Sequence, residues 1–101
     1  MYARTMIGQV KPAKRDEMED AIRIYHDSIV SAAQQQEGFN GALLLSNAHT
    51  GKAISITLWE TEGDMMESEA GGYFQKQITK VAPYLAGPGI VDHFQVSVHT
   101  D

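Results

Sequence analysis

The chain has 101 residues, of which 43% are hydrophobic, and carries a formal net charge of −5 at pH 7. This length predicts one domain, residues 1–101, and the apolar content is ordinary for a folded globular protein. The absence of cysteine excludes disulfides, zinc–thiolate centres and thiol nucleophiles. The acidic balance argues against a surface for nucleic acid or an anionic membrane.

The amino-terminal residues lack an apolar signal core, and no apolar stretch approaches the ~20 residues of a membrane span. We therefore expect a cytoplasmic protein. A domain this small has a thin core, so association with a second copy is a natural source of stability.

The first part of the chain predicts a strand followed by a long helix. Residues 2–10 are rich in strand formers, and Pro12 ends the strand because proline cannot donate to a ladder. Residues 14–36 predict the helix, and Gly38 is expected to cap its carboxyl end. The apolar residues of one helical face recur at steps of four and three: Met18, Ile22, Tyr25, Ile29 and Ala32.

Residues 39–47 and 53–60 predict two strands of a β-hairpin, joined by a short polar turn with a glycine. The three leucines at 43–45 predict a strand that is buried on both faces. The second strand alternates, which places two sets of side chains on opposite faces. These sets are Ile54, Ile56 and Leu58 on one face and Ser55, Thr57 and Trp59 on the other.

The last part predicts two helical pieces and a strand. Thr61 and Asp64 form a capping-box-like start for a helix that the pair Gly71-Gly72 ends after about two turns. Residues 73–82 show apolar side chains at helical spacing, and residues 90–99 alternate as a final strand.

The resulting order is βαββαβ, the ferredoxin-like α+β pattern. We expect one antiparallel sheet with helices on one face. The opposite face of the sheet is also largely apolar, and such a face favours a partner. Two copies packed through these faces would form a homodimeric α+β barrel.

Two segments carry a resemblance to a known family: residues 37–45 (EGFNGALLL) and residues 56–61 (ITLWET). They resemble the antibiotic-biosynthesis-monooxygenase-like family, whose members are dimeric α+β barrels. The resemblance implies cofactor-independent oxygenation of polycyclic aromatic substrates, heme degradation or quinol oxidation, and many members have no known reaction. Heme-degrading members use an asparagine in the first strand, a tryptophan in the third and a histidine in the second helix. Only Trp59 matches that set here.

Trp59, Ser55 and Thr57 are the first candidates for substrate binding. If Trp59 faces the helices, alternation places both small polar residues beside it, which leaves room and hydrogen-bonding groups for a ligand. The alternative is that Trp59 is a large core residue whose N–H needs one partner. Tyr73 and Phe74 follow the two glycines and are candidates for the mouth of such a pocket, or for core packing.

His26 and His93 are the candidate catalytic residues, because an imidazole titrates near neutral pH and can accept a proton. The alternatives are a half-exposed helix residue for His26 and a hydrogen-bonded interface residue for His93. Arg4 on the first strand is either an edge or interface residue or the anchor of an anionic ligand, since an unpaired buried charge is costly. The histidine spacing predicts no metal site, and no cofactor is expected.

Two functions follow from these residues. The first is a cofactor-independent monooxygenase, an oxidoreductase acting on an aromatic, polyketide- or quinol-type substrate. Trp59, Ser55 and Thr57 would hold the substrate, His26 or His93 would take a proton, and the substrate carbanion would supply the electrons. The second is a non-catalytic module of the same fold that binds a hydrophobic ligand or acts in a stress response.

Overall fold

The computed structural model describes residues 1–100. Four strands form one sheet in the order β2-β3-β1-β4, and all neighbouring strands are antiparallel. The strands are β1 (Tyr2–Gln9), β2 (Phe39–Ser46), β3 (Lys52–Trp59) and β4 (Ile90–Gln95). The predicted ferredoxin-like α+β architecture is confirmed.

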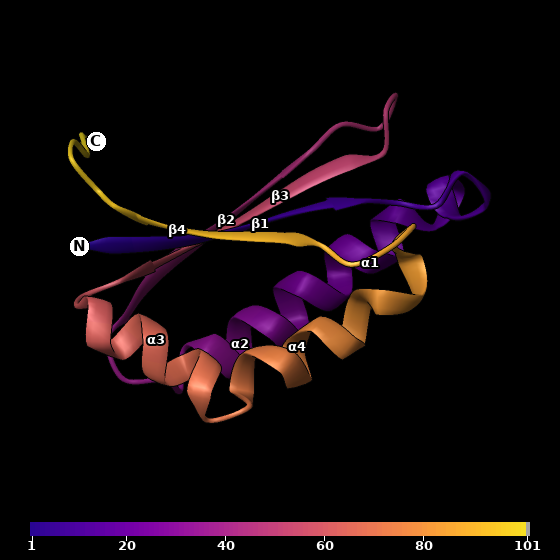
Figure 1. Cartoon of the computed structure of the whole chain (residues 1–101). Helices are drawn as coiled ribbons and strands as arrows, with labels where there is room; N and C mark the ends of the chain where they lie inside the picture. The colour runs from indigo at the N-terminus through magenta and orange to yellow at the C-terminus, as the bar shows by residue number, and fades with distance from the viewer. Residues whose placement is uncertain (101) are drawn as a thin grey trace.

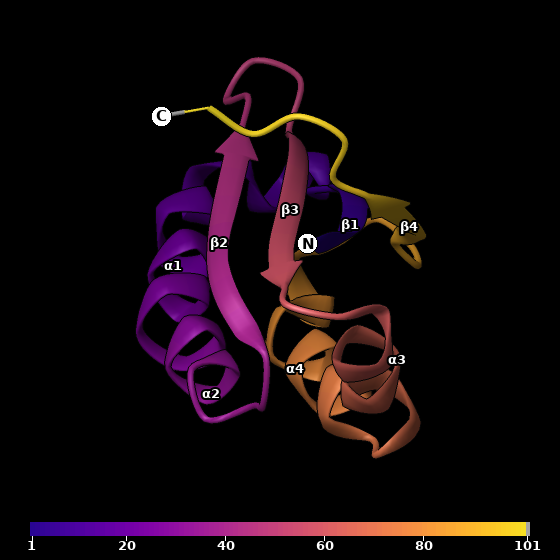
Figure 2. The ribbon, with the colours of Figure 1, turned by 90° about the vertical axis from the view of Figure 1, so that its left-hand side faces the viewer.

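The helices cover one face of the sheet (Figure 1). The first helical segment begins with a 3-10 turn and continues through α1, a π-helical stretch and α2, which together run from residue 12 to residue 33. The second comprises α3 and α4, and Figure 2 shows the two segments on opposite sides of the helical layer. The helices are α1 (Met18–Ile24), the π-helical stretch (Tyr25–Val30), α2 (Ser31–Ala33), α3 (Glu62–Ala70) and α4 (Tyr73–Val81).

Because of the π-helical stretch, the last residue of the predicted apolar face is wrong. A π-helix closes i→i+5 hydrogen bonds and so holds more residues in each turn than an α-helix. The inward positions after Tyr25 are therefore Ile29 and Ala33, spaced by four residues. Ala33 is 1% exposed, whereas the predicted Ala32 is only half-buried.

The glycines and the cap lie close to the predicted element ends. Thr61 accepts a hydrogen bond from the Asp64 N–H at 3.0 Å and caps α3, as expected. Gly72, with a φ of 83°, separates α3 from α4. Gly38 does not cap the first helix, which ends at Ala33, but turns the chain into β2 with a φ of 79°. A Cβ at Gly38 would collide with the side chain of Asp64, and the positive φ also favours glycine there.

Leu44 lies on the helix side of the sheet, and Leu43 is 50% exposed on the opposite face of the single chain. Burial of β2 on both faces therefore requires a partner on that opposite face and stays a prediction. The predicted end of the final strand is wrong. The last strand ends at Gln95 instead of residue 99. Gln95 pairs with Tyr2, the first residue of β1, so residues 97–100 lie beyond the strand with which they would pair.

The face of the sheet away from the helices is open and largely apolar. We call it the outer face, and its side chains alternate with those that point to the helices. Several of its residues are half-exposed or more, including Ile90 at 68% and Phe94 at 51%. The outer face comprises Leu43 and Leu45 of β2, Ile54, Ile56 and Leu58 of β3, Ala3, Thr5 and Ile7 of β1, and Ile90, Asp92 and Phe94 of β4. Within residues 1–100, no helix is long and apolar enough to cross a membrane.

Candidate ligand cavity

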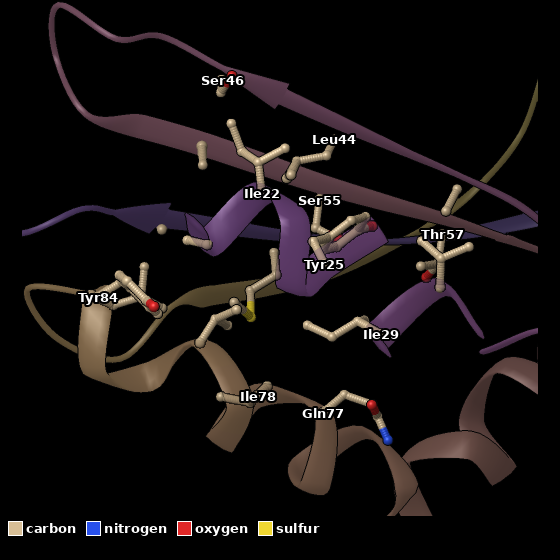
Figure 3. A pocket seen from close by; sticks show the side chains of 18 of the residues that line it. Ile22, Tyr25, Ile29, Leu44, Ser46, Ser55, Thr57, Gln77, Ile78 and Tyr84 are labelled. Carbon is tan, nitrogen blue, oxygen red and sulfur yellow. The ribbon is translucent and has the colours of Figure 1, made fainter. Parts of the chain in front are cut away.

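A cavity of about 110 Å³ lies between the sheet and the helices and is partly open to solvent. Its floor comes from β1, β2 and β3, and its roof from α1, the π-helical stretch and α4 (Figure 3). Aliphatic and aromatic side chains make most of the wall. The polar residues of the wall are Arg4, Tyr25, Ser46, Ser55, Thr57, Tyr73, Gln77 and Tyr84.

Strand alternation explains why Ser55 and Thr57 line this cavity. Both lie on the helix side of β3, and the outward set of β3 lies on the outer face, as the sequence pattern predicts. Figure 3 shows Ser55 next to Tyr25, and their hydroxyl groups share a hydrogen bond of 2.8 Å. The contribution of Ser55 and Thr57 to ligand binding stays a prediction.

Trp59 lies beneath this wall and is fully buried. Its Nε1–H donates to Thr57 Oγ1 at 3.0 Å, which supplies the partner that a buried indole needs. Its ring packs edge-on against Phe39, with 5.7 Å between the ring centroids. Trp59 therefore supports the cavity through Thr57 and does not itself line it in this structure.

Arg4 is the charged residue of the wall and is only 3% exposed. Its Nη1 donates to Ser68 Oγ at 2.7 Å and to Glu69 Oε2 at 3.3 Å. The guanidinium carbon lies 4.1 Å from the centre of the Phe74 ring and 5.2 Å from that of Trp59. Burial lowers the pKa of Arg4, and the hydrogen bond to Glu69 opposes that shift. These contacts hold a cation at one end of the cavity.

Two tyrosines of the helical roof are held in their neutral form. Burial raises the pKa of Tyr73 to about 12, and the nearby charge of Arg4 only partly offsets this. Burial also raises the pKa of Tyr25, against its hydrogen bond to Ser55 and the charge of Arg4. At neutral pH both phenols are therefore protonated and do not act as bases, and each can donate a hydrogen bond.

The two candidate histidines lie outside the cavity wall. His93 Nε2 donates to Glu69 Oε2 at 2.7 Å, which connects it to Arg4 through one carboxylate. Its side chain is 34% exposed and borders a separate shallow hollow beside Tyr2 and Phe94. His26 is 83% exposed and bonds only to the adjacent Asp27 among the described residues. The structure thus brings one histidine near the cavity and leaves the other on the helix surface.

Tyr73 and Phe74, the two aromatics after the glycine pair, both line the cavity. The sequence predicts Tyr25 on the apolar face of the first helix and Arg4 as either an interface residue or a ligand anchor. In the structure, both residues line the cavity. The signal that would have placed Arg4 is its register opposite Thr57, which follows only from the pairing of β1 with β3. Among residues 1–100, no group of three or more histidine, aspartate or glutamate residues is arranged to hold a metal ion.

No protein-family model matches the sequence, and no curated protein matches it significantly. Solved structures do match its fold. SnoaB, a cofactor-independent oxygenase from Streptomyces nogalater, solved in a mutant form, aligns with a TM-score of 0.72 at 15% identity, covering 97% of this chain and 94% of its own. This chain therefore shares the fold of that oxygenase.

Two further structures carry the name "putative antibiotic biosynthesis monooxygenase". The one from Bordetella bronchiseptica has a TM-score of 0.73 at 18% identity and covers 96% of this chain and 97% of its own. The one from Nitrosomonas europaea has a TM-score of 0.71 at 17% identity and covers 97% and 100%. The resemblance noted in the sequence is confirmed at the level of the fold.

Proposed function

We propose that this chain binds a small, planar, largely apolar molecule in its cavity and promotes oxygenation of that molecule by dioxygen without a cofactor. The cavity wall carries the proposal, because it is apolar with a few hydroxyl groups and one guanidinium. An engineered protein cavity of about 150 Å³ binds benzene. By that comparison a cavity of about 110 Å³ holds roughly one aromatic ring, and the rest of the ligand extends into the open mouth.

The proposed reaction draws its electrons from the substrate. A proton leaves an acidic CH₂ group of the substrate, and the resulting carbanion passes its electron pair to dioxygen as a carbon–oxygen bond forms. Protonation gives a hydroperoxide, which loses water and leaves a carbonyl group. The CH₂ group gives up four electrons, and the two oxygen atoms end in the carbonyl and in water. The solved structure of a cofactor-independent oxygenase with the same fold supports this reaction class.

The proton acceptor in this proposal is His93 in preference to His26. Glu69 connects His93 to Arg4 of the cavity wall by two hydrogen bonds, whereas His26 lies on the exposed helix surface. Because the Arg4 guanidinium stays charged and cannot relay a proton, transfer between His93 and a substrate in the cavity would run through water.

A second candidate function is binding without catalysis. One observation favours it: among the described residues that line the cavity, there is no carboxylate and no imidazole. A bound substrate would then meet hydrogen-bond donors but no base in direct contact.

Oxygen uptake distinguishes the two functions. The experiment uses dihydroxy-aromatic and polyketide-like compounds with an acidic CH₂ group, with wild type, His93→Gln and the matched control His26→Gln. We expect uptake with wild type and His26→Gln and a loss of roughly 100-fold with His93→Gln, the typical contribution of a general base. Binding of these compounds without uptake by wild type would favour the non-catalytic module. Uptake unchanged in His93→Gln would remove His93 from the proposal.

We further propose that two copies associate through the outer face of the sheet. The outer face is largely apolar, with Asp92 as a charged residue among its aliphatic and aromatic side chains. Its residues Leu43, Leu45 and Phe94 are each about half-exposed in the single chain. Helices cover only the opposite face (Figure 1). Covering this surface removes apolar area from water, which is the main driving force for such association.

A further inference from the structure

Arg4 is the charged residue among the described residues that line the cavity. The other polar lining residues carry hydroxyl groups, except Gln77, whose amide can both donate and accept. The raised pKa values of Tyr25 and Tyr73 keep their phenols protonated. This end of the cavity therefore offers donors and a positive charge to a ligand.

Arg4 has donors to spare. Every hydrogen bond that the described residues make with its guanidinium starts from Nη1, which donates to Met65 O, Ser68 Oγ and Glu69 Oε2. A guanidinium carries five N–H donors, and those on Nη2 and Nε are not engaged by this set. Glu69, the carboxylate partner, also accepts from His93, so its negative charge is shared between two donors. A ligand oxygen can therefore accept hydrogen bonds from Nη2 and Nε of Arg4.

Thr57 lies directly across from Arg4 in the pairing of β1 with β3, on the same cavity-facing side. Its Oγ1 accepts the indole N–H of Trp59 at 3.0 Å. A threonine hydroxyl has one donor in addition to its lone pairs, so its proton is directed away from Trp59 and is free for another acceptor. Arg4 and Thr57 thus place two kinds of donor side by side at one end of an apolar cavity.

We infer that Arg4 and Thr57 form an oxyanion-binding subsite, so that the cavity selects planar aromatic ligands that carry a negatively charged oxygen at one edge. Carboxylates, phenolates and enolates of aromatic compounds share this chemistry. The inference rests on the proposed function, since it names the class of molecule that the cavity takes. Charge-assisted hydrogen bonds of this type contribute more than neutral ones, and buried arginine suits planar oxyanions.

The test compares 2-naphthoate with 2-naphthamide, which have nearly the same shape and differ in charge. Binding to the whole chain is measured by calorimetry at pH 7. We expect wild type to bind naphthoate about tenfold to hundredfold more tightly than naphthamide. Arg4→Gln should bring the two affinities together by weakening naphthoate alone. Thr57→Val should reduce the preference about threefold to tenfold, and Thr57→Ser, which keeps the hydroxyl, should restore it.

The binding results distinguish failure of the oxyanion subsite from failure of the proposed function. If wild type binds both compounds with equal affinity, or if Arg4→Gln weakens both equally, the oxyanion subsite is wrong while the cavity remains a ligand site. If wild type binds neither compound, the proposed function fails as well. Circular dichroism checks that each variant is folded. If Arg4→Gln does not fold, an unchanged preference in folded Thr57→Val overturns the subsite.

Discussion

Arg4 joins the core to the cavity. One of its nitrogens donates hydrogen bonds to Ser68 and Glu69 of α3, and its guanidinium carbon lies over the rings of Phe74 and Trp59. Its remaining donors are left for the cavity. An uncompensated buried cation costs several kcal/mol, so the cluster around it has to be complete. This requirement links α3, α4 and two strands at the end of the cavity where the proposed chemistry takes place.

Tyr73 makes a residue-scale prediction about alkaline pH. Its pKa is raised from its ordinary value of 10.0 to about 12, so between these values the unfolded chain loses a proton that the folded chain keeps. The unfolded state then binds fewer protons, and the free energy of unfolding falls as pH rises from 10 to 12. Tyr73→Phe should therefore show a smaller fall over this range in urea denaturation. An equal fall in wild type and Tyr73→Phe would contradict the assigned environment of Tyr73.

For single residues, the sequence predicted which face of a strand a side chain lies on better than it predicted the contacts of that side chain. Alternation along β3 was sufficient to place Ser55, Thr57 and Trp59 on one face. Alternation could not predict that Trp59 is fully buried and does not line the cavity. Burial of a strand residue depends on the side chains of the neighbouring strands and helices. The surroundings of His93 likewise depend on Glu69, which is 24 residues away in the chain.

The π-helical stretch is the element that departs furthest from its sequence pattern. Its wider turn brings Tyr25, Ile29 and Val30 to the cavity and moves the inward position of the next turn to Ala33. Periodicity analysis assumes 3.6 residues per turn and so fails just after such a stretch. π-helical turns are frequent at functional sites, and this one forms part of the cavity roof.

A pair of substitutions tests that shift in phase. Ala33→Asp should destabilise the fold by about 3 kcal/mol, because a carboxylate would be placed where the side chain is 1% exposed. Ala32→Asp, on the half-buried neighbour, should cost about 1 kcal/mol or less. Urea denaturation of the two variants measures the difference. Equal destabilisation, or a larger effect at Ala32, would show that the helix keeps an α-helical phase.

Element order and helix breaks were predictable from local chemistry, while the end of β4 was not. The glycine pair and the Thr61 cap act within a few residues, so a local pattern reveals them. The alternation of residues 90–99 continues past Gln95, but a strand needs a neighbour, and β1 starts at Tyr2. Strand length here is determined by the partner strand and not by propensity.

At the scale of the whole molecule, the sheet has one face covered by helices and one left open. The proposed homodimer predicts a mass in sedimentation equilibrium that is twice that of the 11.1 kDa chain. Phe94→Lys should shift the mass toward that of one chain, because a lysine on the outer face would be buried against a second copy. The matched control is Met66→Lys, at a similarly exposed apolar residue of α3. A single-chain mass for wild type at all concentrations would overturn the dimer.

The central claim is that the cavity between the sheet and the helices is the ligand site, and a cavity-filling variant tests it most directly. Ala42 of β2 lines the cavity, so Ala42→Phe would occupy the space of one aromatic ring. Thr79→Phe adds the same ring on the exposed surface of α4 and is the control. The measurement is the dissociation constant of 2-naphthoate for the three folded proteins. We predict binding by wild type and Thr79→Phe and none by Ala42→Phe; a folded Ala42→Phe that binds as tightly as wild type would contradict the claim.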